Sequence, residues 1–139
     1  MILPNIETFI GCESSFEEAS IVLYGAPFDS TTSFRPGARF GPSAMRHESF
    51  GLETYSPYQD KDLIDISVFD SGDLELCFGS SEIALSDIQK RAEEILKAGK
   101  FPLLLGGEHL VTLGAVRAAA AKYPDLQFCK FLPQEMLRV

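Results

Sequence analysis

Short apolar runs alternate along this chain with longer segments in which apolar positions follow a helical period. Residues 20–25 form one continuous apolar run ending in Gly25, and residues 102–105 form another that leads into Gly106 and Gly107. Runs of this kind predict strands that are buried on both faces. Residues 63–69 alternate instead, which predicts a strand with one uniformly apolar face made by Ile64, Ile66 and Val68.

One helix is strongly predicted between the last two strands. Residues 70–73, Asp-Ser-Gly-Asp, predict a turn, after which Ser80 or Ser81 can cap a helix over residues 82–98 that ends at Gly99. Its apolar positions recur at helical spacing and form one stripe for packing on a sheet: Ala84, Leu85, Ile88, Ala92, Ile95 and Leu96. The strand, helix, strand order predicts an α/β fold with a mainly parallel sheet.

Two segments are predicted to meet at one edge of that sheet. Residues 26–42 are dense in glycine, proline, serine and threonine, which predicts an irregular loop, and Pro42 suits the first turn of a short helix over residues 43–46. His109 follows Gly106-Gly107 and is predicted to lie in the first turn of a helix that runs through Ala115 to Lys122. Ligands of open α/β sheets bind at the carboxyl ends of the strands. Metal ligation and a capping or packing role are both open to His109.

Composition limits the partners. The 139 residues suit a single globular domain, and 45% hydrophobic content is enough for a packed core. The formal charge of −8 argues against nucleic acid and anionic membranes as partners, because both attract clustered lysine and arginine. The same charge is compatible with a cationic small molecule. The acidic excess is greatest over residues 51–99, a pattern that usually belongs to a solvated face.

The cysteines and the beginning of the chain indicate a reducing compartment. Cys12, Cys77 and Cys129 are widely spaced and odd in number, so we expect reduced, buried thiols and neither a disulfide framework nor a structural zinc site. The first residues, Met-Ile-Leu-Pro-Asn-Ile-Glu, have no basic region followed by an apolar core. We expect a cytoplasmic protein.

Three motifs in order resemble the arginase and agmatinase family, the manganese ureohydrolases. The first is Gly25-Ala26-Pro27-Phe28-Asp29 leading into Gly37-Ala38-Arg39-Phe40-Gly41-Pro42 and Met45-Arg46; the second is Gly72-Asp73; and the third is Gly106-Gly107-Glu108-His109. Their order and separations are much more specific than any one motif alone. Met45 replaces the commoner isoleucine, a swap that conserves volume. The residues of the first motif resemble those of agmatinases more than those of arginases.

The resemblance implies a three-layer α/β/α fold that is incomplete in this chain. It further implies hydrolysis of a small guanidino substrate such as agmatine, which would give putrescine and urea, at a binuclear Mn²⁺ centre. His109 would be one metal ligand, and subunits would assemble into homo-oligomers. Asp29, Asp73 and Glu108 match no metal-binding position of the family, so we expect capping or supporting roles for them. For Arg35 and Arg39, anion binding is possible, but a structural role is favoured.

The resemblance spans roughly residues 18–127, so we expect residues 1–127 to be the amino-terminal part of a ureohydrolase-like domain, and it fails abruptly over the divergent tail, residues 128–139. The family's other ligand segments, Asp-Ala-His-x-Asp and Asp-x-Asp-x-x-Asp-Pro, do not occur. We therefore expect a frameshift or truncation that leaves a sheet edge open and the chain inactive by itself, with no catalytic residue of its own and substrate-binding residues unknown. The alternative is a non-catalytic fragment that docks on a full-length homologue. A nucleotide-binding module ranks last, because both phosphate-binding glycine motifs are missing.

Overall fold

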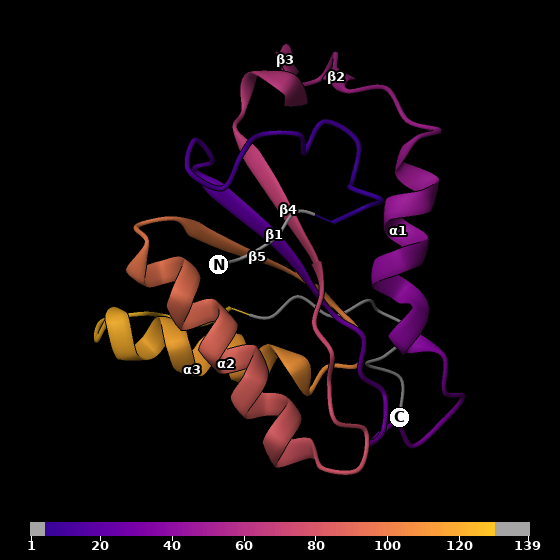
Figure 1. Ribbon diagram of the computed structural model, residues 1–139, viewed down its shortest axis with the longest axis vertical. Helices are drawn as coiled ribbons and strands as arrows, with labels where there is room; N and C mark the ends of the chain where they lie inside the picture. Colours follow the sequence, from indigo (N-terminus) through magenta and orange to yellow (C-terminus); the bar gives the residue numbers. More distant parts are fainter. Residues whose placement is uncertain (1–4, 130–139) are drawn as a thin grey trace.

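Three parallel strands form the centre of the structure, a computed structural model that describes residues 5–129. The strands lie in the order β4 (Val68–Asp73), β1 (Ile21–Ala26), β5 (Phe101–Gly106), so the first strand is central (Figure 1). Ile21 pairs with Val68 on one side and with Phe101 on the other. The predicted α/β fold with a parallel sheet is confirmed.

Helices cover both faces of the sheet. On one face, α2 (Ser81–Lys97) and α3 (Val111–Lys122) pack against each other and against Val22, Tyr24 and Ala26 of β1 (Figure 1). On the other face, Leu23 packs among the residues of the amino-terminal segment, and α1 (Gly41–Ser49) contacts β1 and β5. This gives the three layers that the resemblance implied.

The longest helix follows its predicted pattern. The Ser80 side chain accepts a hydrogen bond from the Ile83 amide at 3.3 Å, and Gly99 has the left-handed φ of 75° that ends many helices. All six residues of the predicted apolar stripe are buried. A Cβ on Gly114 of α3 would lie 2.9 Å from the Ile88 Cβ, so the two helices approach closely only because position 114 has no side chain.

The strand predicted over residues 63–69 is displaced in the structure. Residues Leu63–Asp65 form a 3₁₀ turn, η2, which Asp62 caps by accepting a hydrogen bond from the Ile64 amide. The strand itself is β4, and it continues through residues 70–73, which were predicted as a turn. Gly72, at φ 73°, lies beside the register shift between Leu23 and Gly25 of β1, so an irregular strand replaces the expected turn.

The remaining elements are short. Another 3₁₀ turn, η1 (Ala38–Phe40), leads into α1, where Pro42 lies in the first turn as predicted. A small antiparallel pair, β2 (Tyr55–Ser56) and β3 (Lys61–Asp62), joins α1 to η2.

The strand β5 is less buried than its sequence predicts. Among the described residues it pairs with β1 alone, and Phe101 and Leu103 are 63% and 44% exposed. The prediction of burial on both faces is therefore wrong for β5 here, because β1 occupies the centre of the sheet. The predictions for the tail that concern Lys130 and Pro133 lie outside the described residues.

The prediction for the cysteines can also be compared with the structure. Cys12 is buried, but Cys77 and Cys129 are exposed, so the expectation of three buried thiols is wrong for two of them. Cys77 lies in the loop between β4 and α2, and Cys129 lies beyond the end of α3. No helix within residues 5–129 is long and apolar enough to cross a bilayer.

Candidate functional site at the carboxyl edge of the sheet

The loops after β1 and β5 are joined directly beyond the strand ends. The Gly107 amide donates to the Ala26 carbonyl at 3.0 Å, and the Glu108 amide donates to the Phe28 carbonyl at 2.8 Å. A Cβ on Gly107 would lie 2.1 Å from the Phe28 oxygen, so only glycine permits this approach. The predicted meeting of the two segments at one edge is confirmed.

Glu108 makes side-chain contacts with the loop that follows β1. Its carboxylate accepts from the Thr31 amide at 3.1 Å, from the Thr31 hydroxyl, and from the Thr32 hydroxyl at 2.9 Å. Each of these donors is an uncharged group from more than seventy positions earlier in the sequence. Local sequence gives no signal for such a contact.

Asp29 organises the other half of the same loop. One carboxylate oxygen accepts from the Gly37 amide at 2.7 Å and from the Arg39 amide at 3.3 Å, and the other lies 2.7 Å from Arg39 Nε. Burial raises the pKa of Asp29, but the hydrogen bonds from Gly37 and Arg39 outweigh that effect and hold the pKa below its ordinary value. Asp29 is therefore a loop-organising carboxylate: Oδ2 accepts from two amides, and the buried Oδ1 has the ion-pair contact with Arg39 but no hydrogen bond within the described part of the chain.

The loop after β4 joins the same group of loops through its aromatic residue. Phe78 stacks on Phe28 with ring centroids 6.1 Å apart, and the Arg39 guanidinium lies 4.8 Å from the Phe78 ring centre. A cation over an aromatic face is an attractive arrangement. Arg39 thus has a structural part in this loop, whereas Arg35 has a left-handed φ of 50° and lies over the ring of Phe34, which is 75% exposed.

A buried ion cluster lies beneath these loops. Arg46 of α1, 2% exposed, donates to both carboxylate oxygens of Asp70 at 2.8 and 2.9 Å and to Asp73 at 2.5 Å. Burial lowers the pKa of Arg46, but hydrogen bonds from Arg46 to the two carboxylates outweigh it and raise the pKa. Gly25 makes room for the cluster, since a Cβ there would lie 1.8 Å from Asp73 Oδ1.

This cluster was missed by the sequence analysis. Asp70 also accepts from the amides of Phe9 and Gly72, both at 2.9 Å. Two carboxylates interrupting an otherwise strand-like segment were a usable signal, because a polar residue inside a strand needs a buried partner.

His109 lies at the mouth of a hollow between the loops. Its side chain is exposed, and it occupies the turn before α3, two residues ahead of Val111, so the prediction of a place within the helix is wrong. The turn is closed by backbone hydrogen bonds from the Val111 amide to the Glu108 carbonyl and from the Thr112 amide to the His109 carbonyl. The hollow measures about 580 Å³ and includes Thr31, Thr32, Phe34, Arg35, Glu108 and His109 in its lining.

The described residues do not complete a metal site around His109. Among residues 5–129, no group of three or more histidine, cysteine, aspartate or glutamate side chains is placed to hold a metal ion. The nearby carboxylates are engaged with protein donors, as described above, and the other histidine, His47, contacts Glu7 at 3.2 Å. Stable divalent sites need three or more ligands, so these residues alone do not fit a binuclear centre.

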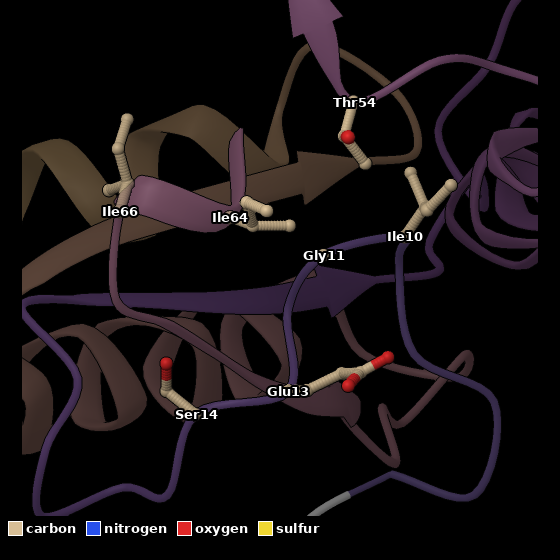
Figure 2. Close-up of a pocket in the computed structure, with 7 residues that line it drawn as sticks. All are labelled: Ile10, Gly11, Glu13, Ser14, Thr54, Ile64 and Ile66. Atoms are coloured by element: carbon tan, nitrogen blue, oxygen red, sulfur yellow. The ribbon is translucent and has the colours of Figure 1, made fainter. Parts of the chain in front are cut away.

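A second hollow lies away from this edge. As Figure 2 shows, seven residues line it: Ile10, Gly11, Glu13, Ser14, Thr54, Ile64 and Ile66. The Ser14 amide donates a hydrogen bond to the carbonyl of Val68, the first residue of β4. The hollow therefore lies near the amino ends of the strands. None of the motif residues lines it, and ligands of parallel sheets bind at the opposite edge.

Comparison with known proteins gives a consistent result. The family model for the arginase family matches residues 19–131. An agmatinase from Bacillus subtilis is 48% identical over 133 residues, which is 96% of this chain and 46% of that protein. The chain therefore spans less than half the length of this curated relative.

Solved structures agree with the sequence relatives. The agmatine ureohydrolase of Thermoplasma volcanium superposes with a TM-score of 0.77 at 33% identity, over 82% of this chain and 39% of that one. The formiminoglutamase of Trypanosoma cruzi with Mn²⁺ superposes with a TM-score of 0.71 at 26% identity, over 81% and 39% of the two chains.

Proposed function

The chain belongs to the arginase family, and from this premise we propose that it is part of an agmatinase-type ureohydrolase. The reaction is the hydrolysis of a linear amidine carbon–nitrogen bond, with agmatine giving putrescine and urea. The observation that carries the proposal is the 48% identity to an agmatinase along nearly the whole chain. The acidic balance of the sequence suits a cationic guanidino substrate.

The carboxyl edge of the sheet is a suitable position for the site of this hydrolysis. The three loops with the motif residues meet at the carboxyl edge of a parallel sheet, where α/β enzymes bind their ligands. His109 lies exposed at the mouth of the hollow there.

Manganese is part of the proposal for the whole enzyme. The Trypanosoma cruzi relative was solved with Mn²⁺, and His109 offers one imidazole ligand. The described residues supply no complete ligand set, so no reaction step is assigned to metal on this chain alone. We expect the isolated chain to be inactive, and we place the whole enzyme in the cytoplasm as a homo-oligomer.

A chimera tests the proposal. Residues 1–127 would replace the matching part of the Bacillus subtilis relative, and release of urea and putrescine from agmatine would be measured with Mn²⁺ present. We expect activity, and we expect His109→Ala to lower kcat/KM by about 100-fold or more. His47→Ala is the matched control and should leave kcat/KM unchanged, because the exposed His47 imidazole pairs with the exposed carboxylate of Glu7. A folded chimera that releases urea from no guanidino compound would refute the proposal.

A second candidate rests on β5. The exposed Phe101 and Leu103 favour a fragment that docks on a full-length homologue. Mixing the chain with the Bacillus subtilis relative and recording native mass spectra distinguishes the two: a stoichiometric complex supports docking, and separate species exclude it.

A further inference from the structure

The Glu108 side chain contacts the loop that follows β1, whereas Gly107 contacts that loop through its backbone. Gly107 has no side chain, and His109 is exposed toward the hollow. We infer that Glu108 is a positioning residue, whose carboxylate holds Thr31 and Thr32 against the turn that presents His109. The inference deepens the proposed function, on which the role of His109 rests, but the contacts themselves can be tested without metal or substrate.

The contacts use both oxygens of the carboxylate. Oε1 accepts from the Thr31 hydroxyl, and Oε2 accepts from the Thr31 amide at 3.1 Å and from the Thr32 hydroxyl at 2.9 Å. Hydrogen bonds to a charged acceptor are stronger than those between neutral groups. With three donors in place, the carboxylate has little remaining capacity for a metal ion, which favours positioning over ligation.

The contacts reach the rest of the loop through Thr32. Its hydroxyl lies 2.9 Å from both the Glu108 carboxylate and the Asp29 carbonyl, so its single proton is shared between them. The Asp29 carboxylate in turn binds Gly37 and Arg39. The turn of His109 is therefore connected through Glu108 and Thr32 to Asp29, and through Asp29 to Gly37 and Arg39 in the loop that forms the other wall of the hollow.

The backbone alone does not provide this connection. The bond from the Glu108 amide to the Phe28 carbonyl joins the loops at their base, whereas Thr31 and Thr32 lie farther along and are exposed. Loss of the carboxylate should leave the base intact and release residues 31 and 32. The expected effect is local rather than global.

Nuclear magnetic resonance on the metal-free chain tests this. Two quantities would be measured: the rate at which the Thr31 amide exchanges with water, and the position of the His109 ring resonance, with His47 as an internal reference. Glu108→Ala should raise the Thr31 exchange rate about fivefold and shift the His109 resonance but not that of His47. Glu108→Gln should restore part of both, because its amide oxygen still accepts. Ser33→Ala, in the same loop, is the control and should change neither.

A double variant separates positioning from a direct charge effect. Thr31→Val with Thr32→Val removes both hydroxyl donors and leaves the charge of Glu108, so it should also shift the His109 resonance. A shift in Glu108→Ala without one in the double variant would overturn the inference, as would unchanged exchange at Thr31 in Glu108→Ala. If Glu108→Ala does not fold, the double variant still decides. Failure of the chimera to hydrolyse agmatine would leave these measurements unaffected, so the two proposals can fail separately.

Discussion

Replacing Arg46 with methionine should remove a large part of the stability of the fold. Methionine keeps much of the side-chain length but none of the donors, so the Asp70 carboxylate, whose side chain is 0% exposed, loses two hydrogen bonds from the guanidinium. Asp73 is 27% exposed and can regain water. The cost therefore arises mainly at Asp70, and breaking a buried ion pair by removing one partner costs about 3–5 kcal/mol.

The assay is urea unfolding followed by circular dichroism. Arg46→Met should lower the free energy of unfolding by about 3–5 kcal/mol, whereas Arg46→Met with Asp70→Asn should lose less, because no uncompensated charge stays buried. Lys90→Met is the matched control. Lys90 Nζ lies 3.2 Å from Asp87 Oδ1 on the surface of α2, and such exposed ion pairs contribute about 0–1 kcal/mol.

Two results would refute the reasoning. A loss below about 1 kcal/mol in Arg46→Met would mean that Asp70 is not held by this pair. A double variant less stable than the single one would mean that the buried charge is not the source of the cost. If Arg46→Met does not fold, Arg46→Lys, which keeps the charge but not the paired donors, should show an intermediate loss.

Two further predictions concern protonation. The pKa of Asp29 lies below its ordinary value, so the ionised group stabilises the fold above a pH of about 4, and this contribution is lost as pH falls through the folded-state pKa. The difference in urea midpoint between wild type and Asp29→Asn should therefore be largest at pH 6 and shrink by pH 3. A difference that stays constant over this range would contradict the prediction. Burial, with the nearby Asp70 charge, raises the pKa of Cys12 to about 11. Iodoacetamide at pH 8 should therefore modify Cys77 and Cys129 in the native chain and all three thiols in urea, and rapid native modification of Cys12 would be the opposing result.

The elements that the sequence predicts well are those decided by local pattern. The apolar stripe and Ser80 were enough to predict helix α2, and a continuous apolar run was enough to predict strand β1. The predicted strand stopped before Asp70 because polar residues are rare inside a buried strand. In the structure Asp70 lies within β4 and pairs with Arg46 of α1, a contact that no local pattern shows.

The candidate site divides in the same way. The position of His109 near the end of β5 follows from the glycines before it, because they mark where the strand stops. The contacts of Glu108 with Thr31 and of Asp29 with Gly37 depend on how two distant strands align. Register between parallel strands is set by the whole sheet, so these contacts become visible only in three dimensions.

The central place of β1 has a consequence for synthesis on the ribosome. Ile21 is made early, yet its partners Val68 and Phe101 follow much later, and at about 5–20 residues per second β5 is complete on the order of ten seconds after β1. Until Val68–Asp73 is made, the apolar nascent strand has no parallel neighbour to pair with, and its other edge stays unpaired until Phe101–Gly106 is made. This high contact order makes folding slow, and it makes the early chain a natural client for chaperones that bind extended apolar segments.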